Sequence, residues 1–332
     1  MILYTWQFEL WQHLWQGGSE RFPHAVLLSG NAGIGKRDFA NSLANSLLCQ
    51  RRRADNHPCG ECDSCRYFEQ NAHPDFRLSQ PDAEDASEEN EVKEKKASEF
   101  ITINQIRLLG EFISLTSHQN GRRVGVICPA EQLNVNAANA LLKMLEEPPP
   151  QTIFILVTNQ LSRILPTIRS RCRIVKMPVP NPVQAAAWLE AEKCVESTLN
   201  LALAGGAPLE ALEHGRNAES HTQRKRFCDT LSRPAAGDPI MLAESIAKLA
   251  PATVMRWLHT WIYDLMSVKA TARSRYHNDL TETLNNLSNN TQLIELNKFN
   301  SELIQAKRLL HHPLNAKLFW ELLFIKYFSL FS

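Results

Sequence analysis

A glycine-rich loop is the first segment whose residue types and spacing could do chemistry. Residues 30–36, Gly-Asn-Ala-Gly-Ile-Gly-Lys, fit the pattern GxxxxGK. In such a loop the glycines (here Gly30, Gly33 and Gly35) let main-chain N–H groups turn toward phosphate oxygens, and Lys36 adds a positive charge. The pattern predicts a phosphate-binding loop. An ordinary glycine-rich turn between a strand and a helix is the alternative.

The residues that a Mg²⁺-dependent ATPase needs next are replaced. A Ser or Thr should follow the lysine and ligate Mg²⁺, but Arg37 stands there and offers no lone pair. An acidic pair should end the apolar run 125–128, but Cys128 and Pro129 stand there and cannot hold a hydrated metal ion. Because the metal neutralises the charge that develops in phosphoryl transfer, we expect no ATP hydrolysis by this chain alone.

Four of the eight cysteines lie close together in the sequence. They are separated by nine, two and two residues, and two interlocked CxxC spacings are typical of a metal site in a reducing compartment. We expect a structural Zn²⁺ with no position open for water, which excludes catalysis there. An iron–sulfur cluster and unliganded thiols are the alternatives, and His57 and His73 lie near enough to compete as ligands. The predicted ligands are Cys49, Cys59, Cys62 and Cys65.

The remaining cysteines, at positions 128, 172, 194 and 228, are expected to be buried small apolar residues. A basic segment includes one of them: residues 169–173 read Arg-Ser-Arg-Cys-Arg. A guanidinium near a domain surface could reach the γ-phosphate of a nucleotide held by a neighbouring subunit. A solvated basic turn, or salt bridges within the chain, is the alternative.

The elements that must position these residues alternate between apolar runs and helical patterns, which predicts a parallel α/β sheet. We expect buried strands at 25–29, 125–128 and 153–158, and helices at 37–49, at 101–117 and between the last two strands. After Arg173 we expect a linker at 178–183 and otherwise only helices. Residues 81–99 are nearly all charged or small, which predicts a disordered acidic loop.

Composition excludes some classes of protein. The 332 residues carry a formal net charge of +1, so no overall field indicates a nucleic-acid or membrane partner. The triplet Arg51–Arg53 is the obvious basic patch, and a solvated face is its alternative reading. Glu321 and Lys326 interrupt the apolar C-terminal stretch, which is too short to span a bilayer. With no signal-peptide pattern, we expect a soluble, cytoplasmic protein.

The order of the motifs resembles the subunits of bacterial sliding-clamp loaders, which are members of the AAA+ family. The resemblance covers roughly residues 20–215. It is carried most specifically by Asn139–Pro149 (NALLKMLEEPP) and by Ser170-Arg171-Cys172, with support from the cysteines, His73-Pro74-Asp75 and Ile103-x2-Ile106-Arg107.

This resemblance implies a domain organisation. An AAA+ domain over 1–175 would carry a zinc insertion at 49–65 and the acidic loop, followed by a small helical lid domain at 176–217 and a helical collar domain at 218–332. The apolar C-terminal side chains suit either an internal core or a collar interface; they include Leu318, Phe319, Leu322, Leu323 and Phe328.

The resemblance also implies roles for residues. Arg171, within the Ser170-Arg171-Cys172 motif, matches the family's arginine finger, which acts on ATP bound by an adjacent gamma/tau subunit. Thr158-Asn159 matches the sensor-1 region. At the start of the sensor-2 helix, where a basic residue is usual, Leu209 and Glu210 stand instead. This third departure also argues against hydrolysis.

The implied partners are gamma/tau and delta subunits in a hetero-pentamer, the sliding clamp, and primed DNA, with ATP and Mg²⁺ held by the neighbours. We therefore expect a non-hydrolysing stator of the loader. An ATP-hydrolysing subunit of the gamma/tau type and a zinc-containing DNA-binding module are the alternatives.

Overall fold

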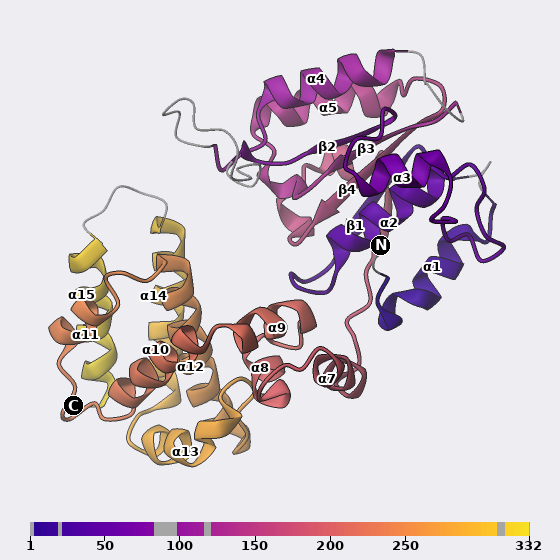
Figure 1. The fold of residues 1–332 in the computed structure, drawn as a ribbon. Helices are drawn as coiled ribbons and strands as arrows, with labels where there is room; N and C mark the ends of the chain where they lie inside the picture. The colour runs from indigo at the N-terminus through magenta and orange to yellow at the C-terminus, as the bar shows by residue number, and fades with distance from the viewer. Residues whose placement is uncertain (1–2, 19–21, 83–97, 116–120, 311–315, 332) are drawn as a thin grey trace. The chain divides into compact units, whose positions relative to one another are not determined.

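The computed structural model describes residues 3–18, 22–82, 98–115, 121–310 and 316–331 (Figure 1). The chain divides into two compact units, residues 1–184 and 185–332. Most of the acidic loop predicted at 81–99 lies outside the described residues. The finer division into AAA+, lid and collar domains stays a prediction.

The first unit is built on a five-stranded sheet in which every pairing is parallel. The strand order β2-β3-β4-β1-β5 puts β1, which leads into the glycine-rich loop, between β4 and β5. The three predicted strands are confirmed, and so is the predicted fold class, a P-loop α/β sheet joined to a helical C-terminal part. The strands are β1 (Ala25–Ser29), β2 (Phe76–Ser79), β3 (Arg123–Ile127), β4 (Thr152–Thr158) and β5 (Arg173–Lys176).

Two strands were not predicted, and both are edge strands. β2 and β5 have four residues each, and their burial is uneven, whereas every residue of β1, β3 and β4 is buried. The expectation that no strand follows Arg173 is wrong, because β5 pairs with β1 from Val26↔Arg173 to Ser29↔Lys176. Edge strands are short and charged so that they resist pairing with other chains, and this weakens their hydrophobic pattern.

Helices cover both faces of this sheet (Figure 1). Successive strand residues point to opposite faces, so Val26 and Leu28 pack into one hydrophobic cluster, whereas Ala25 and Leu27 pack into the other. The first cluster includes residues of α1 (Phe8–Trp15) and α2 (Lys36–Leu48). The second includes residues of α4 (Ile103–Ser114), α5 (Val135–Glu146) and α6 (Pro166–Arg169).

Local sequence sets the bounds of the predicted helices. Thr102 accepts a hydrogen bond from the N–H of Gln105 at the start of α4, and Asn134 does the same for Ala137 at the start of α5. The proline run 148–150 follows Glu147, the C-cap of α5. A short helix that was not predicted, α3 (Asp63–Glu69), lies in the cysteine segment.

The second unit is helical and holds two separate hydrophobic clusters. The small cluster comprises Ala185, Leu189, Leu201, Ala211 and Leu212. The large cluster surrounds Trp261 and Tyr327, whose side chains are fully buried. The helices are α7 (Pro182–Ala191), which begins in the first unit, α8 (Ser197–Leu203), α9 (Pro208–Arg216), α10 (Ala218–Leu231), α11 (Pro239–Ser245), α12 (Pro251–Thr271), α13 (Thr281–Asn289), α14 (Leu293–Leu309) and α15 (Ala316–Phe328).

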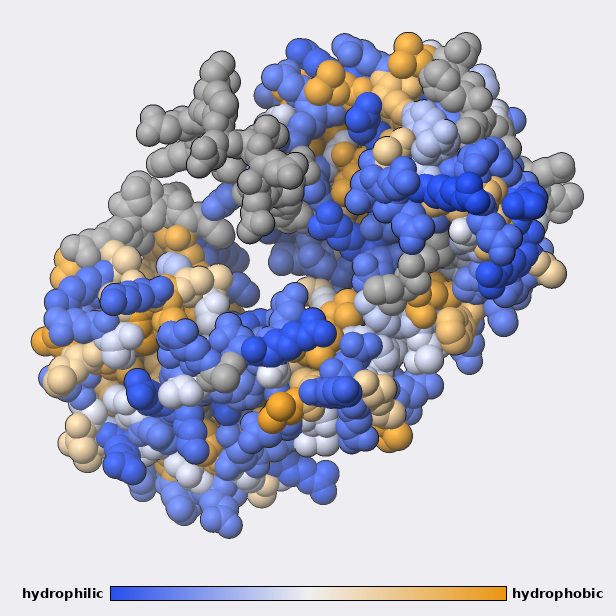
Figure 2. Space-filling model, in the orientation of Figure 1, coloured by the Kyte–Doolittle hydropathy of each residue, from blue (hydrophilic) through white to orange (hydrophobic). Residues whose placement is uncertain are grey.

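The apolar residues of α15 divide between the core and the surface. Leu323 and Phe328 are buried in the large cluster, whereas Leu318 and Leu322 are 61% and 56% exposed. On the face shown in Figure 2, hydrophobic patches interrupt a mostly hydrophilic surface on each unit. Among the described residues, no helix combines the length and apolar character that crossing a membrane requires.

Candidate functional site

The glycine-rich loop has the predicted strand–loop–helix setting. It follows β1 and ends where α2 begins at Lys36. Gly33 (φ +68°) and Gly35 (φ +82°) adopt left-handed conformations, which glycine takes at no steric cost. Gly35 is the N-cap of α2, and no side chain caps that end of the helix. The left-handed conformations at Gly33 and Gly35 therefore let the chain turn from β1 into α2.

An N-terminal segment covers this loop, which sequence reasoning did not foresee. Trp6 and Gln7 each donate a side-chain hydrogen bond to the carbonyl oxygen of Ile34, at 3.1 Å and 3.0 Å, and Gln7 also bonds the carbonyl oxygen of Gly35 at 3.0 Å. The Tyr4 ring fills the space where a side chain at Gly35 would stand. The residues Tyr4–Gln7 form no recognisable phosphate-binding motif, so nothing in the sequence indicated this contact.

The side chain of the loop lysine forms a hydrogen bond within the loop itself. Lys36 is buried, and its Nζ donates a hydrogen bond to the carbonyl oxygen of Asn31. Burial lowers the pKa of Lys36 to about 8, although the charges of Glu131 and Cys128 act in the opposite direction. The adjacent Arg37 donates a hydrogen bond to the side-chain oxygen of Gln80. Neither side chain offers an oxygen to Mg²⁺.

A cysteine and a proline follow β3 directly. Cys128 is buried directly after the strand, and no carboxylate occupies its position or that of Pro129. The carboxylate that acts on Lys36 is Glu131, three residues after Cys128. Its Oε1 accepts a hydrogen bond of 3.0 Å from the N–H of Asn159, the residue after β4.

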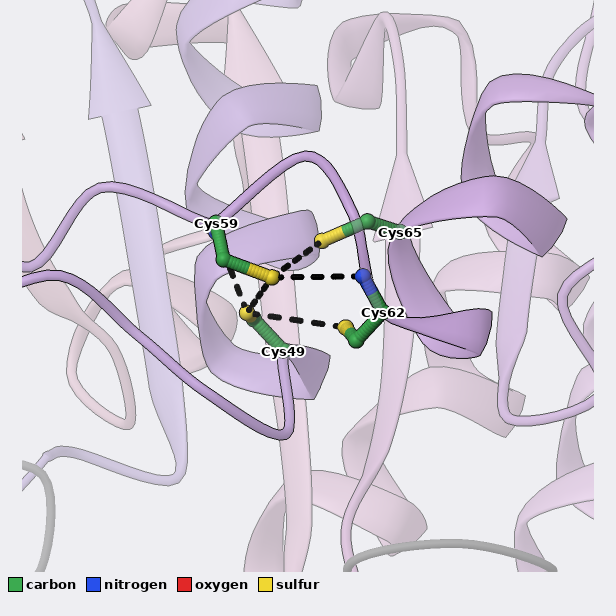
Figure 3. Close-up of side chains that lie close together, drawn as sticks. All are labelled: Cys49, Cys59, Cys62 and Cys65. Atoms are coloured by element: carbon green, nitrogen blue, oxygen red, sulfur yellow. Dashed lines mark hydrogen bonds between the residues drawn. The ribbon is translucent and has the colours of Figure 1, made fainter.

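The four predicted cysteine ligands come together (Figure 3). Their sulfur atoms all lie within 4.8 Å of one another. The Sγ of Cys49 lies 3.7 Å from that of Cys59 and 3.9 Å from that of Cys62, and Cys59 and Cys65 are 3.9 Å apart. Four sulfurs about 2.3 Å from a tetrahedral Zn²⁺ would be about 3.8 Å apart. These three separations match, so the cluster could hold such an ion.

Main-chain N–H groups donate hydrogen bonds to the sulfurs of Cys49 and Cys59. The Sγ of Cys59 accepts from Glu61 and Cys62, and that of Cys49 accepts from Cys59, at 3.3–3.5 Å. The hydrogen bond from Glu61 is the main cause that lowers the pKa of the Cys59 thiol to about 6, whereas burial raises the pKa of Cys49 and Cys65. Donors aimed at sulfur stabilise thiolates, the form that binds metal.

The two histidines near the cysteines do not belong to the cluster. The Nε2 of His73 lies 2.8 Å from the Oγ of Ser64, and its Nδ1 accepts from the N–H of Asp75. The ring of His57 stacks on Trp11 at 5.0 Å. Among the described residues, the metal-ligand cluster therefore consists of sulfurs alone.

The arginine segment, residues 169–173, runs from the last residue of α6 to the first residue of β5. The Nη2 of Arg171 is 2.6 Å from Oε1 of Glu146, the last residue of α5, and its Nη1 donates to the carbonyl oxygen of Thr167 at 2.9 Å. Ser170 Oγ donates to the same carbonyl oxygen at 3.0 Å. Cys172 is half-buried, which raises the pKa of its thiol to about 11. The structure thus places a salt bridge within the chain at Arg171.

The structure also places the four remaining cysteines and the basic triplet Arg51–Arg53. Cys128 and Cys228 are buried as predicted, whereas Cys172 and Cys194 are only half-buried. The triplet Arg51–Arg53 is partly used within the chain. The Arg52 guanidinium lies 4.9 Å above the Trp15 ring, in a cation–π contact.

Comparison with known proteins identifies the family to which this chain belongs. Residues 7–181 match the family model described as "DNA polymerase III, delta subunit", and residues 218–327 match "DNA polymerase III, delta subunit, C terminal". A protein of Pseudomonas aeruginosa named "DNA polymerase III subunit delta'" is 37% identical over 81% of this chain and 79% of its own length.

Two other relatives carry the same name. That of Haemophilus influenzae is 35% identical over 64% of this chain and 61% of its own length. That of Escherichia coli is 31% identical over 80% of this chain and 77% of its own length. The chain belongs to the family of DNA polymerase III delta' subunits.

Proposed function

We propose that this chain is a non-hydrolysing subunit of a sliding-clamp loader and donates Arg171 to the ATP site of an adjacent gamma/tau subunit. The observation that carries the proposal is how two side chains of its own nucleotide loop, Lys36 and Arg37, are hydrogen-bonded. The ammonium group of Lys36 is bound to the carbonyl of Asn31, and Arg37, in place of a magnesium ligand, is bound to Gln80.

The covering segment supports the same conclusion. Trp6 and Gln7 donate three buried hydrogen bonds to the carbonyl groups of Ile34 and Gly35, so a nucleotide that displaced this segment would break all three. A buried donor that loses its partner costs about 1–3 kcal/mol. With no oxygen ligand at Arg37 or Cys128 to hold Mg²⁺, binding would not recover this cost through the metal.

The surroundings of Arg171 support its role as a donor. Its side chain is about one-third exposed, at the end of a short helix. A planar guanidinium can form paired hydrogen bonds to phosphate oxygens, and an arginine supplied by a neighbouring subunit can stabilise the charge of phosphoryl transfer. In this proposal the chain joins gamma/tau and delta subunits in a cytoplasmic hetero-pentamer that loads the sliding clamp onto primed DNA.

We also propose that Cys49, Cys59, Cys62 and Cys65 hold a structural Zn²⁺. The segment 49–65 contains few apolar side chains, and its own buried cluster consists of cysteines. A bound ion would cross-link α2, the loop after it and α3, a task that a hydrophobic core performs elsewhere. All four positions would be filled by sulfur, so the site would have no catalytic role.

The test of the donor role is Arg171→Ala in a reconstituted loader. We expect DNA-stimulated ATP hydrolysis at the adjacent site to fall by about 10³-fold or more while the complex still assembles. The matched control is Arg173→Ala, which removes an exposed arginine two residues away. Wild-type hydrolysis at the adjacent site by the Arg171→Ala complex would exclude the donor role.

The isolated chain separates this proposal from its two rivals. We expect neither micromolar Mg-ATP binding nor turnover, whereas a gamma/tau-type ATPase would show both. A zinc-containing DNA-binding module would instead bind DNA with an affinity that falls steeply as salt increases. Equilibrium dialysis with ATP and a titration with primed DNA at two salt concentrations make the distinction.

A further inference from the structure

The guanidinium of Arg171 is held by two kinds of partner. Thr167 and Ser170 lie in or beside α6, next to Arg171 in the chain, and their oxygens accept from Nη1 at 2.9 Å and 3.4 Å. Glu146 lies at the end of a different helix, and its Oε1 accepts from Nη2 at 2.6 Å. Glu146 is therefore the partner that fixes the guanidinium relative to the rest of the first unit.

The contact with Glu146 leaves part of the guanidinium unused. Of the five N–H groups of an arginine, the bonds to Glu146, Thr167 and Ser170 use three. The N–H of Nε and one N–H of Nη2 take part in none of these bonds. A phosphate that approaches them also approaches the carboxylate bound to the same Nη2, and two anions so close together repel each other.

We propose that Glu146 is a positioning residue for Arg171: it holds the guanidinium within this subunit until the γ-phosphate of a neighbouring site displaces it. This inference rests on the donor role of Arg171 proposed above. A phosphate carries more negative charge than a carboxylate and offers three acceptor oxygens, so it wins the competition once it is in reach. Before that, Glu146 reduces the fraction of time for which Arg171 is available.

The exposure of the pair sets the size of the effect. The side chains of Arg171 and Glu146 are 34% and 49% exposed, so water and salt screen their attraction. Exposed ion pairs change an equilibrium by a factor of at most about five. Glu146 therefore restrains Arg171 weakly, which suppresses hydrolysis before DNA binds without blocking it afterwards.

The neighbouring Glu147 provides a matched control. It is an exposed glutamate one residue further along the chain, and it forms no ion pair within the part of the chain that the structure describes. Glu146→Gln and Glu147→Gln each remove one negative charge and keep the size of the side chain. Only the first removes the charge that faces Arg171.

The experiment measures ATP hydrolysis by loaders that carry each variant, with and without primed DNA. We expect Glu146→Gln to raise the DNA-free rate about two- to five-fold and to leave the DNA-stimulated rate unchanged, and Glu147→Gln to change neither. A merely structural role would lower both rates. A DNA-free rate that stays the same or falls in Glu146→Gln would overturn the proposal.

Two further variants distinguish the failure of this inference from the failure of the donor role. In an Arg171→Ala loader, Glu146→Gln should have no effect, because its target is gone. If Arg171→Ala itself leaves hydrolysis normal, the donor role is wrong. If Arg171→Ala is defective and Glu146→Gln has no effect in the wild-type loader, only the positioning role is wrong.

The contact itself can be tested in the isolated chain. A double-mutant cycle with Arg171→Ala and Glu146→Gln should show that the unfolding equilibrium constants are coupled by a factor of up to about five. Strictly additive effects would show that the pair does not form in solution, and this would overturn the proposal independently of any loader assay.

Discussion

The ammonium group of Lys36 donates a hydrogen bond to the carbonyl oxygen of Asn31, so the lysine bonds to the main chain of its own loop. A lysine that serves a bound phosphate would direct its ammonium group to the ligand. Here it is buried and bonded to the loop, and burial lowers its pKa. The group whose charge would assist phosphoryl transfer thus lowers the stability of the fold.

This cost gives a pH dependence with a defined sign. The pKa of Lys36 is about 8 in the folded chain and about 10.5 when unfolded, so the unfolded state binds the proton more tightly. Relative to Lys36→Met, the wild-type chain should therefore gain stability as pH rises from about 8 to 10.5, by at most about 3–4 kcal/mol. Urea unfolding of both chains at pH 7.5 and 10 measures the difference. Equal slopes with pH would contradict it.

Removal of the metal should loosen the cysteine segment. We expect about one zinc per purified chain, and loss of zinc in Cys62→Ser, because three sulfurs cannot close a tetrahedral site. The peptide between Cys49 and Cys62 should then become a site of rapid proteolysis. Cys194→Ser, which alters a cysteine outside the cluster, should retain the metal. Zinc content by atomic absorption and limited proteolysis with and without a chelator are the measurements.

If Cys62→Ser keeps a full equivalent of zinc, the four-sulfur assignment is wrong. Iron in place of zinc, with visible absorption from a cluster, would favour the iron–sulfur alternative.

A buried carboxylate in the second unit should be important for stability. Asp264 is fully buried and accepts hydrogen bonds from the N–H groups of Arg275, Tyr276 and His277, and its Oδ2 lies 3.1 Å from Nδ1 of His277. Burial alone would raise the pKa of Asp264, but the hydrogen bonds from His277 and the backbone outweigh burial and lower it.

Asp264→Ala leaves these donors without an acceptor and should destabilise the fold by about 3–5 kcal/mol. Glu295→Ala, which breaks an exposed pair with Lys298, should cost less than about 1 kcal/mol. Urea unfolding of the two variants tests the contrast, and similar losses in both would refute this account of Asp264.

A second pH dependence should appear on the acid side. Arg256 lies 3.1 Å from Nε2 of His214, and burial, with the charges of His221 and Arg224, lowers the pKa of His214. The unfolded state then binds the proton more tightly, so the stabilising contribution is complete above about pH 6.5 and is lost as pH falls below it.

The wild-type chain should therefore lose more stability between pH 7.5 and 5.5 than His214→Gln, which cannot titrate. Thermal unfolding at the two pH values measures this loss, and identical pH sensitivity in both chains would show that His214 makes no contribution to it.

The sequence by itself determined the framework of the first unit. The buried strands are continuous apolar runs, because helices cover the parallel sheet on both faces, and such runs are visible without a structure. The cysteine spacing likewise identified all four members of the cluster, since short loops between ligands restrict where the sulfurs can lie. Arg37 and Cys128 could be recognised from the sequence as residues that offer no oxygen ligand to Mg²⁺, because that property depends on residue type alone.

Only the tertiary structure decided how distant segments meet. The edge strands β2 and β5 are defined by hydrogen bonds to their neighbours rather than by their own hydrophobic pattern. Tyr4–Gln7 and the loop are separated by more than twenty residues, and no local pattern predicts their contact. Glu146 and Arg171 meet because α5 and α6 pack on the same face of the sheet, and packing of this kind depends on the whole hydrophobic core rather than on either segment.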